Sequence, residues 1–235
     1  MALPKITAPT YKMIRPSTGE EIEYRPFLVG EEKILLMAYE TEDPRQISNA
    51  VLKLVHSCTY GSIGDKNDPM FDIEYAFLKI RGKSVAETIQ INLICQDDGK
   101  TEVPYEINTD DIEILVDEDH STEIKLNDDF TLIMRYPTAQ DSISMVGMSG
   151  LTEMSFAIAQ NCIETIIHGE ESYNKVDLSK KELQEFFESL TQEMFKQVQD
   201  FFDTMPKLRH EVEIENPNTN VKSTVVLEGL ASFLG

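Results

Sequence analysis

Apolar and polar residues alternate near the start of the chain. Tyr11 and Met13 precede the segment 16–19, which reads Pro-Ser-Thr-Gly, and Ile22 and Tyr24 follow it. Alternation with a period of two is typical of a strand with one buried face, and proline and glycine favour a reversal between two strands. The pattern predicts a short β-hairpin.

Helical periodicity comes next. Asp43 is placed to cap a helix, Pro44 suits its first turn, and Gln46 is placed to complete a capping box. The apolar residues beyond them recur with a period of about 3.6 and form one stripe. They are Ile47, Ala50, Val51, Leu54, Val55 and Cys58. Two shorter helices are predicted on either side, at 34–38 and from 72 to about 81.

From residue 87 the apolar period changes to two, which predicts strands. Residues 89–95 and 103–107 alternate on either side of Asp97-Asp98-Gly99, a sequence that favours a tight turn. Further strands are predicted at 112–116, 124–126 and 132–134.

Beyond Pro137 the pattern becomes helical again. One helix is predicted from about Ala157 to near Gly169. A longer one begins at Ser179, which forms a capping box with Glu182, and runs for about 38 Å to Pro206. Its apolar stripe is widened by three further phenylalanines. The stripe consists of Leu183, Phe187, Leu190, Met194, Val198, Phe201 and Met205, and the additional residues are Phe186, Phe195 and Phe202.

The chain ends in a second hairpin and a short apolar tail. The hairpin pairs 212–214 with 225–227 across the turn 216–220. We therefore predict an α+β protein. Its N-terminal domain, residues 1–137, mixes a hairpin, helices and acidic antiparallel strands. Its C-terminal domain, residues 138–235, is predicted to be mostly helical, with the long Phe-rich helix and the terminal β-hairpin.

Charge narrows the range of partners. The 235 residues include 42 Asp and Glu against 21 Lys and Arg, a formal charge of −21. Nucleic acids and anionic membrane surfaces both attract Lys and Arg, so we expect neither as a partner. No basic leader precedes an apolar stretch, and no apolar run approaches the ~20 residues that span a bilayer. Three widely separated cysteines fit a reducing compartment. We expect a soluble, cytoplasmic protein.

No motif for catalysis or metal binding stands out. The four histidines lie singly, and neither a glycine-rich phosphate loop nor a G-x-S-x-G sequence occurs. Cys58 and Cys162 fall on apolar helix faces, where unreactive buried thiols are expected. The acidic stretch 102–129 lacks the residue order of a calcium loop and is interpreted as a solvated face or loop, with docking to a basic partner as the alternative. We predict no catalytic residue, no metal, no cofactor and no enzymatic activity.

Four blocks of sequence, in order along the chain, carry a family resemblance. They are Arg25–Leu36, Phe71–Val85, Phe201–His210 and Leu227–Leu230. The first reads RPFLVGEEKILL and the second FDIEYAFLKIRGKSV. Together they resemble the T4-like bacteriophage baseplate hub assembly proteins over roughly the whole chain.

The resemblance implies a non-enzymatic tail morphogenesis protein. It would bind baseplate hub or tail proteins and assist assembly of the hub in the host cell cytoplasm. The alternative is a stoichiometric structural component of the mature baseplate or tail, and self-association is also left open. The family resemblance further implies that an ordinary hairpin turn at Cys95 replaces a cysteine-pair metal knuckle of relatives.

The matched blocks also supply candidate interaction residues. Aromatic and apolar anchors dominate interface energetics, but every one of these residues could instead serve the core or a structural ion pair. The candidates are Arg25, Phe27, Glu31, Glu32, Phe201, Phe202, Met205, Leu208, Arg209, Leu230 and Phe233.

Overall fold

The computed structural model describes residues 7–148 and 150–233 of the chain. The chain forms two compact units, which are described separately. The first combines Met1–Leu115 with Lys207–Gly235, and the second is Val116–Pro206. Residue 137, where the sequence suggests a domain boundary, lies inside the second unit between a strand and a helix.

The first unit begins with the predicted hairpin and three helices. Strands β1 (Tyr11–Ile14) and β2 (Glu21–Tyr24) pair antiparallel, with Met13 opposite Ile22. Helices α1 (Val29–Tyr39), α2 (Pro44–Cys58) and α3 (Met70–Ser84) follow. The predicted Asp43 cap of α2 is confirmed, because its carboxylate accepts a hydrogen bond from the backbone N–H of Arg45 at 2.9 Å. The predicted capping box is not formed, since the Asp43 N–H donates to Thr41 Oγ1 at 3.2 Å and Gln46 Nε2 donates to Asp43 Oδ2 at 3.1 Å.

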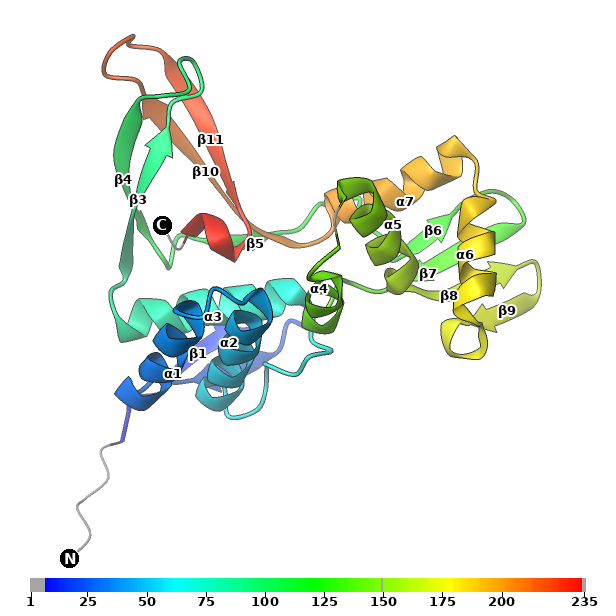
Figure 1. The fold of residues 1–235 in the computed structure, drawn as a ribbon, viewed down its shortest axis with the longest axis horizontal. Helices are drawn as coiled ribbons and strands as arrows, with labels where there is room; N and C mark the ends of the chain where they lie inside the picture. Colours follow the sequence, from blue (N-terminus) through cyan, green and yellow to red (C-terminus); the bar gives the residue numbers. More distant parts are fainter. Residues whose placement is uncertain (1–6, 149, 234–235) are drawn as a thin grey trace, which may run out of the picture. The chain divides into compact units, whose positions relative to one another are not determined.

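Two small antiparallel sheets complete the first unit (Figure 1). Strands β3 (Thr88–Ile94) and β4 (Glu102–Asn108) form one sheet. In the other, β10 (Lys207–Glu215) lies between β11 (Lys222–Glu228) and β5 (Glu113–Leu115). A 3₁₀ turn, η2 (Leu230–Phe233), follows β11. Both predicted hairpins, β3–β4 and β10–β11, are confirmed.

Hydrogen bonds join the turns of these two hairpins. The Asp97 carboxylate accepts from Asn216 Nδ2 at 2.9 and 3.1 Å and from Thr219 Oγ1 at 2.5 Å. Asn218 Nδ2 donates to Thr101 Oγ1 at 3.0 Å. The bonds from Asn216 and Thr219 lower the pKa of Asp97. The turn near Cys95 is thus anchored to the neighbouring hairpin by hydrogen bonds.

A buried ion pair ties the N-terminal hairpin to α3. Asp72 is fully buried and accepts from Arg15 Nε at 2.7 Å and from the backbone N–H of Ser17 at 2.9 Å. Asp68 holds the same guanidinium at 2.9 Å. A buried carboxylate is tolerated only when it is paired and hydrogen-bonded, so this network fixes the hairpin turn on the helix.

The second unit packs helices against a four-stranded sheet. The strand order is β6 (Glu123–Lys125), β7 (Phe130–Met134), β8 (Ile163–His168), β9 (Glu171–Asn174), all antiparallel. Its helical elements are α4 (Ala139–Met145), α5 (Leu151–Cys162), η1 (Lys175–Asp177), α6 (Lys180–Glu188) and α7 (Gln192–Thr204). One core contains Leu132 from the sheet, Cys162 from α5, Phe187 from α6 and Val198 from α7.

The predicted fold class is wrong in its arrangement. Helices and strands are mixed throughout the described residues, and the C-terminal part is not mostly helical, because it contains β8 to β11. Residues 163–168 form a strand between β7 and β9. The apolar spacing of Ile163, Ile166 and Ile167 fits a helix stripe as well as a half-buried strand, so periodicity alone could not separate them.

The prediction of a single long helix from Ser179 to Pro206 is also wrong. Helix α6 ends at Glu188 and α7 begins at Gln192. Thr191 caps α7, since its hydroxyl accepts from the backbone N–H of Met194 at 3.3 Å. The predicted capping box at Ser179 is confirmed, with Glu182 accepting from the Ser179 N–H at 2.8 Å. A continuous apolar stripe therefore spans two helices that face the same core.

We predict that Asp72→Asn lowers the free energy of unfolding by about 3 kcal/mol, because it weakens the pair that the fully buried Asp72 forms with Arg15. Urea unfolding followed by tyrosine fluorescence measures this. The matched control is Glu21→Gln, which breaks the exposed pair with Lys12 on the same hairpin and should cost less than about 1 kcal/mol. Equal effects of the two substitutions would contradict the role given to Asp72.

Candidate protein-binding surface on helix α1

Helix α1 has more exposed than buried apolar residues. Only Leu35 and Ala38 are buried among its eleven residues. Ile34, Leu36 and Met37 are 58%, 55% and 56% exposed. A surface helix normally carries polar residues at its exposed positions, and here three of those positions carry large apolar side chains. Clustered exposed apolar side chains mark interaction sites on soluble proteins.

The start of α1 is held by a two-pronged ion pair. Arg25 Nη1 and Nη2 donate to Glu31 Oε2 and Oε1 at 2.8 and 2.7 Å. Glu31 also accepts from the backbone N–H of Leu28 at 2.7 Å, which satisfies an otherwise unpaired donor at the helix start. Both charged side chains are mostly shielded from water, with 15% and 20% of their surfaces exposed.

The same pair reaches the end of α2. Ser57 Oγ donates to Glu31 Oε1 at 2.6 Å, and the backbone N–H of Arg25 donates to the carbonyl of Cys58 at 2.9 Å. The Arg25 hydrogen bonds, with help from Ser57 and against the effect of burial, lower the pKa of Glu31 to about 2. Glu31 is therefore an anion at neutral pH, and it fixes the entry to α1 against α2.

An apolar groove of about 380 Å³ runs beside α1. Phe27 borders it, and its backbone N–H is held by Ser84 Oγ at 3.0 Å. Arg81 Nη1 is buried at the groove with no hydrogen-bond partner among the described residues. Burial raises the pKa of Tyr39, which stays a neutral phenol. The lining residues are Phe27, Glu32, Leu35, Leu36, Tyr39, Phe77, Arg81 and Val85.

The first candidate block is thus brought together in one place. Arg25 and Glu31 form the ion pair, while Phe27 and Glu32 line the groove. Sequence reasoning did not select the exposed residues of α1 or the groove residues from α3. The run Ile-Leu-Leu-Met-Ala at 34–38 could have indicated the exposed residues, because five consecutive apolar residues cannot all lie on the buried side of a helix.

The other candidates are mostly core residues. Phe201 is 3% exposed and stacks on Tyr136, while Phe202 and Met205 are half-buried. Leu208 is almost fully buried in β10, and Arg209 beside it pairs with Glu211 at 2.8 Å. Leu230 and Phe233 of η2 are buried in the first unit. Their assignment as contacts stays a prediction.

Burial disfavours the thiolate form of the three cysteines. Cys58, Cys95 and Cys162 are buried and unpaired by disulfides. Burial raises the pKa of Cys58 and of Cys162 to about 12, so both remain protonated thiols. In the part of the chain that the structure describes, no cluster of three or more His, Cys, Asp or Glu is arranged to hold a metal ion. Over the same residues, no helix is long and apolar enough to cross a membrane.

Comparison with known proteins defines the class of this chain. The family model described as "T4 bacteriophage base plate protein" matches residues 8–235. The protein belongs to this family of bacteriophage baseplate proteins. No curated protein and no solved structure gives a significant match to the chain.

The ion pair at the start of α1 makes a prediction about pH. Because the pKa of Glu31 is lower in the folded chain than in the unfolded one, its stabilisation is complete above about pH 5 and is lost as the pH falls toward 2. After a discount for solvent screening, it contributes about 1–2 kcal/mol at pH 7.

Urea unfolding of the parent and of Glu31→Gln at several pH values measures that contribution. The difference between the two free energies of unfolding should shrink between pH 5 and pH 2. A difference that stays constant over this range would rule out a stabilising Glu31 carboxylate.

Proposed function

We propose that this baseplate protein is a non-enzymatic assembly factor that binds a hub or tail subunit through the exposed face of α1 and the groove beside it. The observation that supports the proposal is the set of three large apolar side chains, Ile34, Leu36 and Met37, each more than half exposed on one short helix. Exposed apolar residues favour association because burying them removes apolar area from water.

The groove gives the α1 surface a shape that a partner can fill. Its volume of about 380 Å³ is enough for a few apolar side chains, and Phe27, Leu36 and Phe77 supply apolar walls. The partner's anchor would also meet Arg81, whose buried Nη1 lacks a partner among the described residues. A carbonyl or carboxylate oxygen from the partner would satisfy that nitrogen once the side chain turns toward it.

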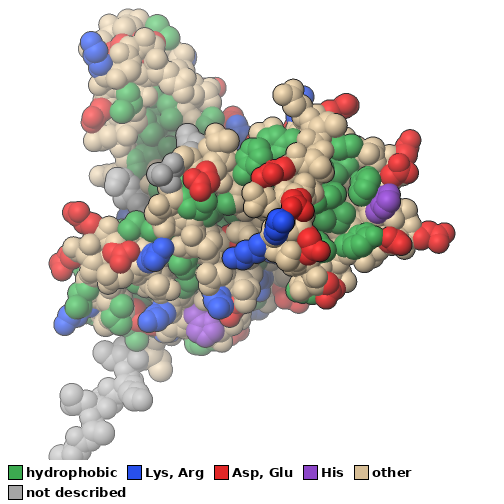
Figure 2. Space-filling model, turned by 45° about the vertical axis from the view of Figure 1, so that its right-hand side comes forward, with side chains coloured by type: hydrophobic (Ala, Val, Ile, Leu, Met, Phe, Trp, Pro, Cys, Tyr) green, Lys and Arg blue, Asp and Glu red, His purple; other side chains and the backbone are tan. Residues whose placement is uncertain are grey.

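Charge contributes to the choice of partner. The face in Figure 2 carries many Asp and Glu side chains with apolar side chains between them. With a formal charge of −21, the chain repels acidic proteins and its own copies, and it attracts basic surfaces. A hub or tail subunit with an apolar patch rimmed by Lys and Arg fits this surface.

The alternative is a stoichiometric structural component of the mature baseplate. The assembly factor and the structural component would use the same α1 contact, and they differ in how long that contact lasts. An assembly factor acts in the host cell cytoplasm and is absent from finished particles, whereas a component stays in the tail. Quantitative mass spectrometry of purified particles distinguishes the two.

We predict that Ile34→Glu and Met37→Glu each weaken binding to the partner subunit at least tenfold, since a charge would be buried in an apolar contact. The chain is co-expressed with hub and tail subunits of the phage, and complexes are measured by size-exclusion chromatography with light scattering. Both positions are exposed, so the monomer should keep its stability within about 0.5 kcal/mol.

The control is Val176→Glu, which adds the same charge at a side chain that is 91% exposed in the second unit. It should leave the complex intact. If the two α1 variants bind as well as the parent chain, the α1 surface is not the contact. If no subunit forms a complex while the chain assembles with itself, the assembly-factor proposal fails.

A further inference from the structure

Strand β3 has one unpaired edge. It pairs with β4 on one side, from Thr88 opposite Asn108 to Ile94 opposite Glu102. No other described strand pairs with it. Its seven residues read TIQINLI, with no charge and no proline, in a chain where 27% of residues are charged. An uncharged edge strand is a template for pairing with another chain.

The remaining sheet edges are protected. Every other edge strand in the described ranges carries a charged residue or a proline. Such residues prevent an edge strand from pairing with another chain. Strand β4 contains Pro104 between two glutamates, and β5 is three residues long. At β11, Gln96 Nε2 donates to the carbonyl of Thr224 at 3.3 Å. The edge of β3 is therefore an exception that the rest of the fold does not share.

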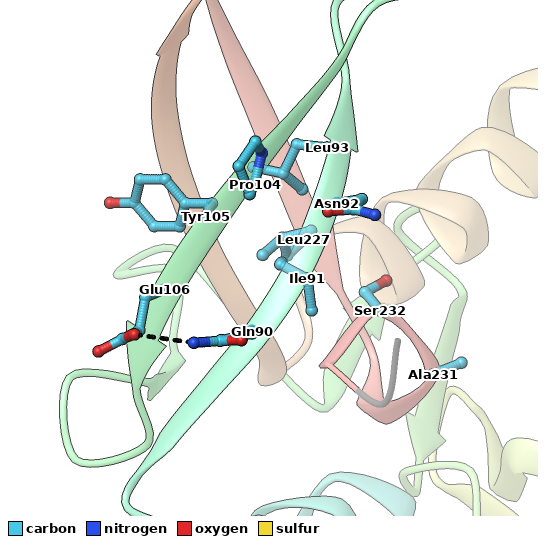
Figure 3. A pocket seen from close by; sticks show the side chains of 10 residues that line it. All are labelled: Gln90, Ile91, Asn92, Leu93, Pro104, Tyr105, Glu106, Leu227, Ala231 and Ser232. Atoms are coloured by element: carbon cyan, nitrogen blue, oxygen red, sulfur yellow. Dashed lines mark hydrogen bonds between the residues drawn. The ribbon is translucent and has the colours of Figure 1, made fainter.

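A groove of about 860 Å³ lies against this strand. In Figure 3, Ile91 of β3 and Leu227 of β11 point toward one another, and Ala231 and Ser232 of η2 lie at one side. Gln90 Nε2, which donates to Glu106 Oε2 at 3.3 Å, borders the groove on β3. The groove thus lies beside a strand that has no pairing partner on its other edge among the described strands. The lining residues are Gln90, Ile91, Asn92, Leu93, Pro104, Tyr105, Glu106, Leu227, Ala231 and Ser232.

We propose that the β3 edge takes an extended segment of another protein as an added antiparallel or parallel strand. Main-chain hydrogen bonds would supply affinity, and every second side chain of the segment would enter the groove. Those side chains are apolar, to match Ile91 and Leu227. Among the described residues that line the groove, Glu106 alone is charged. Its negative charge favours a segment that carries a basic residue and no acidic one.

A second copy of this chain fits the groove poorly. The alternate side chains of β3, among them Ile89, Ile91 and Leu93, are already buried in their own unit. If two β3 strands paired, each groove would stay unfilled, because these side chains are packed inside their own unit and cannot enter the groove of the other copy. The charge of −21 on each copy also opposes self-association. An extended segment of another protein that is not packed before binding has free side chains to place in the groove, and it need not carry the same negative charge.

The probe is the blocked heptapeptide Lys-Val-Thr-Val-Thr-Val-Thr, added to the ¹⁵N-labelled full chain. We expect saturable shifts of the amide signals of residues 88–94, with a dissociation constant on the order of 10⁻⁴ M. The same peptide with alternate amides N-methylated along its pairing edge should bind at least tenfold more weakly, because it cannot complete the ladder.

Two variants test the groove itself. Ala231→Trp places a large side chain in the groove and should weaken peptide binding at least tenfold. Val221→Trp, at an exposed side chain outside the groove, should leave it unchanged. Ile34→Glu on α1 should also leave peptide binding unchanged. The β3 proposal can therefore fail without affecting the α1 proposal, and the reverse.

Three results would overturn the proposal. The first is the absence of saturable shifts at residues 88–94 at about ten times the expected dissociation constant. The second is equal binding of the N-methylated peptide, which would indicate apolar contact without strand pairing. The third is protection of β3 amides that rises with protein concentration in the absence of peptide, which would indicate a second copy.

Discussion

The ion pair between Arg25 and Glu31 is the interaction on which the α1 surface depends. A helix of eleven residues is marginal in water on its own. Helix α1 buries only Leu35 and Ala38, so packing alone gives it little support. The Arg25–Glu31 pair, joined by Ser57 and the carbonyl of Cys58, attaches its first turn to the end of α2. Because polar contacts hold the helix start, the apolar side chains of its outer face are left available to a partner.

Two surfaces of the first unit thus depart from the rules that keep a protein monomeric. Helix α1 exposes large apolar side chains at positions that are polar on an ordinary surface helix. The β3 edge is uncharged where the other edges are blocked. A strongly acidic chain can tolerate both, because repulsion between copies opposes self-association. For a member of a baseplate protein family, two such surfaces suit a chain that contacts other subunits.

Local sequence signals predicted the elements that are stabilised locally. The N-terminal hairpin, the Asp43 cap of α2 and the turns after β3 and β10 depend on neighbouring residues, and each is confirmed. The strand at 163–168 could not be predicted, because its pairing partners β7 and β9 decide between strand and helix. The break at 189–191 is marked by polar caps at Ser189 and Thr191, which lie inside an otherwise unbroken apolar stripe.

The same division applies to the candidate site. Arg25, Phe27, Glu31 and Glu32 were found through a sequence block that also supplies the ion pair. The groove residues Phe77 and Arg81 lie some fifty residues further along the chain, and only tertiary packing brings them to α1. Exposure of Ile34 and Met37 is likewise a property of the fold, since a run of apolar residues is equally compatible with complete burial.

The central claim is that the outer face of α1 contacts another subunit. Hydrogen–deuterium exchange of the chain, alone and in its purified complex with a hub or tail subunit, tests it most directly. The account predicts slower exchange at the amides of residues 29–39 in the complex, since a covering partner shields the helix and opposes its opening. Unchanged exchange over these residues, with protection confined to the second unit, would contradict it.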